Sequence, residues 1–224
     1  MSAARRSQKP ANVRARAKRR MEKLLTRERE LWEQGLSRVA GCDEAGTGPL
    51  AGPVVAAAVI FPPGVGLLGV DDSKTRTPEQ RERLAGEIRE AAADFAVAVV
   101  EPDEIDRLNI YHAALEAMRR ALSALDPAPE HVLVDGRAVP RFDPPQERIV
   151  KGDARCHAIA AASILAKTER DRLMAAYEET FPGYGFAQHK GYPTQEHRDA
   201  IRRLGPSPIH RRSFVLIPQP RLFD

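Results

Sequence analysis

Apolar residues recur through the middle of the chain in short runs that alternate with longer segments of helical periodicity. Short runs rich in Val, Ile, Leu and Ala predict β-strands at residues 38–43, 54–61, 95–100, 132–135 and 148–150. Longer segments with apolar positions every three or four residues predict helices at residues 78–92, 109–125, 156–180 and 195–204. Strands interleaved with helices predict one mixed α/β domain.

Local signals support two of the helices. Thr77 followed by Pro78 is typical of a helix start, with threonine as the N-cap and proline in the first turn. In the segment 109–125, the apolar face predicts the core residues Ala113, Leu115, Met118 and Leu122.

Charge is distributed unevenly along the 224 residues. Residues 1–30 hold eleven Lys or Arg against three Glu, whereas the whole chain has a net charge of only +4, so the remainder is net acidic. The basic start predicts a disordered arm over residues 3–20 that attracts phosphate, followed by a helix over residues 21–34. It lacks the apolar core of a signal peptide, and no run is long enough to span a membrane. We therefore expect a cytoplasmic protein with no membrane partner.

The most distinctive chemistry follows the first strand run, where Asp43 and Glu44 precede a loop with Gly46 and Gly48. Adjacent side chains on a strand point to opposite faces, so two neighbouring carboxylates share one ion only where the alternation breaks. The glycines predict that break. Carboxylate oxygens suit Mg²⁺ or Mn²⁺ rather than zinc. For an Asp-Glu pair alone, however, a solvated turn is the simpler interpretation.

Two further acids, Asp135 and Asp153, each come at or just after a later strand run and beside a glycine. An α/β sheet assembles a site in this way, along the edge where its strands end. Gathering four acids costs repulsion unless a cation offsets it, so the pattern predicts a metal site. Cys42 and Cys156 fit no metal or disulfide spacing and are predicted to be buried as small apolar side chains.

Near the C-terminus, Tyr184, Phe186 and Tyr192 are interleaved with His189 and Lys190. Aromatic rings beside basic side chains are typical of a nucleic-acid groove, where rings stack and cations meet phosphate. The alternative is a loop that packs its rings on the core.

The order of these blocks resembles ribonuclease HII, the bacterial type 2 ribonuclease H. The resemblance covers roughly residues 38–214. It is carried by Gly41 to Val54, Asp72-Ser73-Lys74, Leu108-Asn109-Ile110, Val134-Asp135-Gly136, Lys151-Gly152-Asp153, and residues 159–167, 184–194 and 210–214. It implies a ribonuclease H-like α/β fold: a five-stranded mixed sheet flanked by helices, with a helical C-terminal extension. The expected division is a basic arm and helix (1–36), a catalytic domain (37–214) and a tail (215–224).

The resemblance also implies an activity. The expected enzyme is a metal-dependent endonuclease that hydrolyses the RNA strand of RNA–DNA hybrids. It also cuts 5′ to ribonucleotides embedded in duplex DNA, leaving a 3′-hydroxyl and a 5′-phosphate. Its implied catalytic and metal-binding residues, with Mg²⁺ or Mn²⁺ as the cofactor, are Asp43, Glu44, Asp135 and Asp153. Its implied substrate contacts are Gly46, Thr47, Gly48, Ser73, Lys74, Lys167 and Tyr192.

One departure concerns Thr47, because the family usually has arginine between its two loop glycines. The loss of this cation leaves two alternatives open: a nuclease of the same fold that cuts another structure such as a four-way junction, and a nucleic-acid-binding adaptor with a decayed site. The complete set of four carboxylates favours an active enzyme.

The tail from Gln219 to Asp224 resembles the short peptide with which bacterial DNA-processing proteins bind the sliding clamp. Leu222 and Phe223 would fill a pocket on that partner. Alternatively, they pack on their own domain, which we expect to be a monomer.

Overall fold

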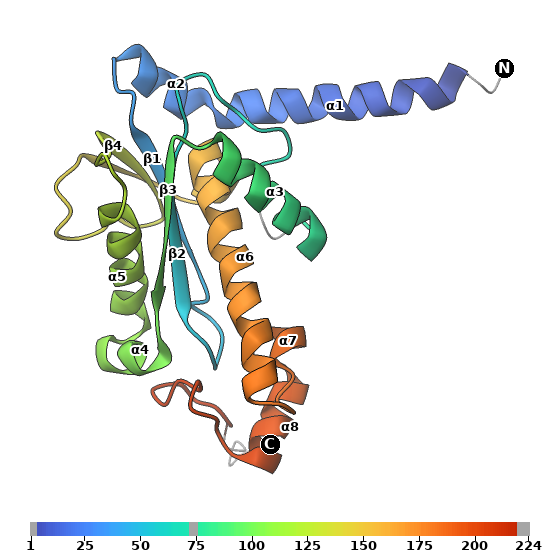
Figure 1. Ribbon diagram of the computed structural model, residues 1–224, viewed down its shortest axis with the longest axis vertical. Helices are drawn as coiled ribbons and strands as arrows, with labels where there is room; N and C mark the ends of the chain where they lie inside the picture. Colours follow the sequence, from blue (N-terminus) through green and yellow to red (C-terminus); the bar gives the residue numbers. More distant parts are fainter. Residues whose placement is uncertain (1–3, 72–75, 219–224) are drawn as a thin grey trace, which may run out of the picture.

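The centre of the molecule is a five-stranded mixed sheet with the order β3-β2-β1-β4-β5 (Figure 1). The computed structural model describes residues 4–71 and 76–218, with side chains from residue 12 onward. The strands are β1 (Val39–Ala45), β2 (Val54–Ile60), β3 (Asp94–Val100), β4 (His131–Asp135) and β5 (Gln146–Ile149). β1, β2 and β3 pair antiparallel, whereas β4 and β5 join β1 in parallel. This arrangement confirms the predicted α/β fold with five strands.

Helices cover both faces of the sheet and extend beyond its ends. They are α1 (Ala4–Leu24), α2 (Thr26–Glu33), α3 (Pro78–Ala91), α4 (Pro102–Leu108), α5 (Ile110–Ser123), α6 (His157–Thr180), α7 (Phe186–His189) and α8 (Gln195–Leu204), with a 3₁₀ turn, η2, at Gly152–Ala154. Figure 1 shows α3 and α6 on one face and α4 and α5 on the other. The helix start predicted at Thr77 is confirmed by a capping box with Gln80.

Each face of the sheet carries its own apolar core. On the α5 side, the predicted core residues Ala113, Leu115, Met118 and Leu122 are buried. On the other side, α6 lies very close to β1, since a Cβ on Gly41 would stand 2.1 Å from the backbone carbon of Ala158. Glycine on the strand and alanines on the helix therefore permit this contact. Cys42 and Cys156 are buried and free, as expected.

The prediction of a disordered arm over residues 3–20 is wrong for residues 4–20, which belong to α1 and extend away from the body (Figure 1). Alanine, arginine and lysine favour a helix, and together they outweigh the one interior proline, Pro10. The following helix is anchored, because Glu28 Oε1 accepts hydrogen bonds from the Ala158 N–H at 2.8 Å and the Cys156 thiol at 3.1 Å. The N-terminal helices are thus joined to the start of α6.

Membrane insertion finds no support in the described part of the chain. Across residues 4–71 and 76–218, every helix is too short or too polar to cross a bilayer.

Candidate functional site

Asp43 and Glu44 both lie within β1, which pairs regularly with β2 as far as Ala45. The expected break in alternation between the two acids is therefore wrong, because the neighbouring strand holds β1 straight and the glycines come only afterwards. Asp43 faces α6, where the Ser163 hydroxyl hydrogen-bonds it. Glu44 faces α5 and lines a cavity there.

Asp135 and Asp153 reach this part of the sheet from the β4 side. β4 pairs with β1 through Val134 and Cys42, so Asp135 comes directly beside Asp43 in register. The Gly152 N–H donates a 2.6 Å hydrogen bond to Asp135 Oδ1, which holds the η2 turn and Asp153 next to it. Asp153 thus lies in a 3₁₀ turn four residues after β5, not at a strand end.

The acids share one electrostatic environment. Burial, and then the charges of Glu44 and Asp135, raise the pKa of Asp43 well above its ordinary value. The hydrogen bond from Ser163 acts in the opposite direction. Sequence reasoning missed Ser163; the available signal was a single hydroxyl within the apolar run of residues 158–166.

The donor atoms of these four side chains are of the type that divalent cations prefer. All four donors are carboxylates, and a cation would offset the repulsion that raises the Asp43 pKa. As they stand, no three acidic, histidine or cysteine side chains of the described residues converge closely enough to hold an ion.

The loop after β1 is held from beneath by two buried arginines, Arg211 and Arg170, which are 0% and 1% exposed. The Arg211 guanidinium donates to the backbone carbonyls of Gly46 (2.6 Å), Thr47 (3.4 Å), Pro49 (2.8 Å), Gly52 (3.0 Å) and Pro53 (3.2 Å). Arg170 donates to the carbonyls of Ala51 (3.1 Å), Pro53 (3.0 Å) and Lys190 (3.0 Å). The carbonyls of this loop therefore point inward.

The N–H groups of Thr47 and Gly48 donate to no acceptor among the described residues, which leaves them available to a ligand. Gly46 has a φ of +97°, and a Cβ there would lie 2.2 Å from Arg170 Nε. A Cβ on Gly48 would meet only Tyr192 Cε1, at 3.7 Å. Gly46 is thus required by packing, whereas Gly48 keeps an open surface beside Tyr192.

Neither buried arginine forms a salt bridge within the described part of the chain. Burial lowers the pKa of Arg170 to about 10 and that of Arg211 to about 9, so both remain charged at neutral pH. Sequence reasoning missed them, because it gave neither Arg170 nor Arg211 a role. Their carbonyl partners lie more than 100 residues away, apart from Lys190, and no local pattern marks such contacts.

The predicted aromatic groove is only partly present. Tyr192 is 43% exposed, but Tyr184 and Phe186 are buried and stack with centroids 5.1 Å apart. The alternative, rings packed on the core, is correct for those two. Beneath them, His197 and His210 form an Nε2–Nε2 contact of 3.1 Å, and burial lowers both pKa values to about 4.

The structure describes one of the three remaining predicted substrate contacts, Lys167. Lys167 on α6 forms an ion pair of 2.5 Å with Asp171, and burial is the main cause of its lowered pKa. Ser73 and Lys74 lie outside the described residues.

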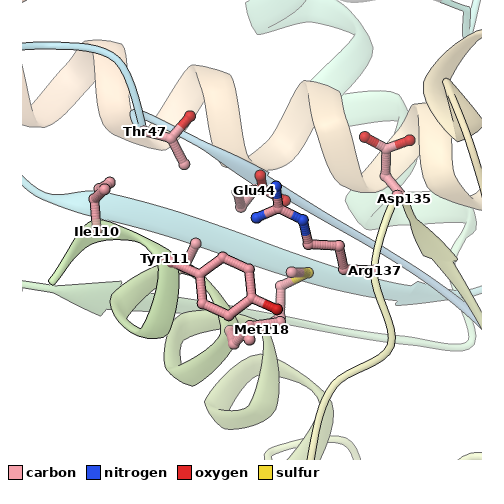
Figure 2. A pocket seen from close by; sticks show the side chains of 10 residues that line it. Glu44, Thr47, Ile110, Tyr111, Met118, Asp135 and Arg137 are labelled. Carbon is pink, nitrogen blue, oxygen red and sulfur yellow. The ribbon is translucent and has the colours of Figure 1, made fainter. Parts of the chain in front are cut away.

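Glu44 and Asp135 open on a cavity of about 480 Å³ between β1, α5 and the end of β4. Thr47, Tyr111 and Arg137 also line it, and Figure 2 shows the Arg137 side chain pointing toward Glu44. Acids, a cation and an aromatic ring therefore meet beside the loop.

Comparison with known proteins gives a consistent result. The family model described as "Ribonuclease HII" matches residues 40–217. A ribonuclease HII of Myxococcus xanthus is 57% identical over 197 residues, covering 88% of this chain and 67% of that protein. One from Moorella thermoacetica is 55% identical over 195 residues, covering 87% and 95%. The structure of the PCNA:RNase HII complex from Archaeoglobus fulgidus aligns with a TM-score of 0.67 at 27% identity, covering 82% of this chain and 98% of that one.

Proposed function

The chain belongs to the ribonuclease HII family and is a ribonuclease H endonuclease, and we propose that Asp43, Glu44, Asp135 and Asp153 are its catalytic carboxylates. The main support for this assignment is the electrostatic coupling at Asp43, because the charges of Glu44 and Asp135 raise the pKa of this buried acid. Such a cluster is stable with all acids ionised only when a cation is added.

The bound group is proposed to be Mg²⁺ or Mn²⁺. When bound, divalent cations supply an activated water and stabilise the leaving 3′-oxygen of the cut strand. Asp43 would hold them from the α6 side, and Glu44 from the cavity on the α5 side. Asp135 and Asp153 would complete the set from β4 and the η2 turn, which a hydrogen bond ties together.

The ribonucleotide is proposed to bind over the loop. The 2′-hydroxyl distinguishes RNA from DNA, so its recognition needs polar groups that face the substrate. The N–H groups of Thr47 and Gly48 are oriented for this, because Arg211 holds the loop carbonyls inward. Tyr192 stands beside Gly48 and would stack on the sugar. Gly46 shapes the turn. Ser73 and Lys74 are proposed to contact a phosphate of the DNA strand, and Lys167 is proposed as a further substrate contact.

The test is a cleavage assay with four duplexes in Mg²⁺ and in Mn²⁺. They are an RNA–DNA hybrid, a DNA duplex with one ribonucleotide, an all-DNA duplex and a DNA four-way junction. We expect cleavage of the first two, with the second cut 5′ to the ribonucleotide to leave a 3′-hydroxyl. Cutting of the junction, or binding without any cleavage, would contradict the proposal.

We further propose that residues 215–224 dock into a sliding clamp, which would bring the enzyme to DNA that contains ribonucleotides. The support is the peptide pattern from Gln219 to Phe223 and the Archaeoglobus ribonuclease HII, which was solved with PCNA. Gln219 to Asp224 lie outside the described residues. Titration of bacterial clamp with wild type and with a Leu222→Ala/Phe223→Ala variant tests the proposal, and equal affinities would refute it.

A further inference from the structure

Arg137 stands over the ring of Tyr111, with its Cζ 4.6 Å from the ring centroid. Both side chains line the cavity that Glu44 and Asp135 open on, and Figure 2 shows the Arg137 guanidinium between Glu44 and the Tyr111 ring. Tyr111 is 45% exposed, so one part of its surface supports the guanidinium while the pair still faces solvent. A cation–π contact of this kind restrains an otherwise mobile side chain.

Arg137 is the one cationic side chain among the described residues that line this cavity. It forms no salt bridge within the described part of the chain, although two acids share the cavity with it. A strand of nucleic acid that approaches Glu44 and Asp135 brings phosphates into an acidic environment. A restrained guanidinium beside those acids supplies the charge and the paired donors that a phosphate requires.

Thr47 lines the same cavity but offers one short hydroxyl. A threonine cannot provide the charge or the two parallel donors of an arginine. A phosphate near the loop would therefore find its cationic partner in the same cavity, on the segment that follows β4.

We propose that Arg137 binds a backbone phosphate of the substrate strand beside the carboxylates, and that Tyr111 is the positioning residue that holds it there. The proposal rests on the proposed function, because it takes a ribonucleotide-containing duplex as the ligand. It assigns to Arg137 the phosphate contact that Thr47 cannot make.

The first test compares Arg137→Gln with Arg141→Gln. Arg141 is an exposed arginine on the same β4–β5 connection, but it lines a different cavity, with Arg107 and Arg119. Binding of a one-ribonucleotide duplex is measured without divalent metal over a salt series. We expect about tenfold weaker binding at low salt for Arg137→Gln and a salt slope smaller by about 0.9, as for one lost phosphate contact. Arg141→Gln should match wild type.

The second test adds Thr47→Arg to wild type and to Arg137→Gln. We expect the new arginine to restore affinity and slope in the variant and to add little to wild type. Tyr111→Leu should weaken binding, whereas Tyr111→Phe, which keeps the ring, should not. Matching thermal unfolding curves show that the variants are folded.

The proposal is overturned if Arg137→Gln and Arg141→Gln bind alike with the same slope. It is also overturned if Thr47→Arg raises the affinity equally in wild type and in Arg137→Gln, because the two positions would then contact different phosphates. Failure of the proposed function is seen separately, as absence of cleavage by the wild-type protein with metal.

Discussion

In the loop of residues 46–53, Arg170 and Arg211 bind the backbone carbonyls from beneath. A few residues earlier, Asp43 and Glu44 face opposite sides of β1, and their charges repel each other. The loop is therefore complete before any ligand arrives. The carboxylates are not, since no three of the described acidic, histidine or cysteine side chains converge on one point. One region is fixed by cations within the fold, and the other gathers acids whose mutual repulsion a divalent cation would offset.

The difference separates recognition from chemistry. A rigid loop loses little entropy when it binds, so discrimination of the 2′-hydroxyl can be built into the fold. Acids that repel one another stay inactive until metal and substrate neutralise them, which couples hydrolysis to the presence of both. Variants should therefore affect the two properties independently.

The largest expected effect is on chemistry. Asp135→Asn should reduce cleavage on the order of a thousandfold, because it removes one of the proposed ligands of the charge-stabilising ions. Substrate binding should largely persist, since phosphate contacts supply affinity. Without metal the variant should be at least as stable as wild type, because one source of the raised Asp43 pKa is gone.

Single-turnover cleavage and duplex binding are measured on the same preparations. Asp143→Asn, an exposed acid on the β4–β5 connection, is the matched control and should behave as wild type. Unchanged cleavage by Asp135→Asn in saturating Mn²⁺ would show that the carboxylates are not the metal site.

The next effect is on the loop. Arg211→Met keeps an unbranched apolar stem but leaves several buried carbonyls without donors, which should cost about 3 kcal/mol or more of unfolding free energy. Arg212→Met changes the exposed neighbour and should cost little. Urea denaturation measures both. A loss below about 1 kcal/mol for Arg211→Met would mean that the loop holds its shape without the arginine.

Much of this organisation could be predicted from sequence, because it is local or follows from topology. Apolar runs predicted the five strands, and strand-end acids predicted that Asp43 and Asp135 would meet. The glycines alone could not predict which face of the sheet each acid points to, because pairing with β2 keeps β1 regular through Glu44. The helix α4 was missed because it is short and ends at Asn109, whose φ of 63° breaks it from α5.

The remaining misses have a common cause. Arg211 contacts the Gly52 carbonyl across 159 positions, and no periodicity records such a pair. Tyr184 and Phe186 have the composition of a binding groove, but composition does not reveal which way a ring faces. Contacts between residues distant in sequence determine both the partners of Arg211 and the direction of the two rings.

Acid should weaken the support beneath the loop. Burial lowers the pKa of His197 and His210 to about 4 from an ordinary 6.5, and His189 adds charge of the same sign nearby. Between pH 6.5 and 4, the unfolded chain takes up protons that the folded chain does not. Stability should therefore fall as the pH drops through this range and level off below it.

The measurement is the urea midpoint at a series of pH values. The midpoint of His197→Asn should fall less steeply with decreasing pH than that of wild type. His112 is an exposed histidine on α5, and the midpoint of His112→Asn should follow wild type. Parallel curves for all three would place the acid sensitivity elsewhere, for example at the buried His157, whose pKa is also lowered to about 4.

The smallest effect on stability, and the sharpest test of the comparison, concerns the two loop glycines. In Gly48→Ala the new methyl would meet only Tyr192 Cε1, at 3.7 Å, so the unfolding free energy should change by less than about 0.5 kcal/mol. In Gly46→Ala it would lie 2.2 Å from Arg170 Nε at a φ of +97°, so that variant should lose stability. Binding of a one-ribonucleotide duplex should weaken in Gly48→Ala even though the fold is intact, because the methyl stands where the sugar must approach. If Gly48→Ala binds as wild type does, the open surface beside Tyr192 is not where the ribonucleotide lies, and recognition belongs to another part of the site.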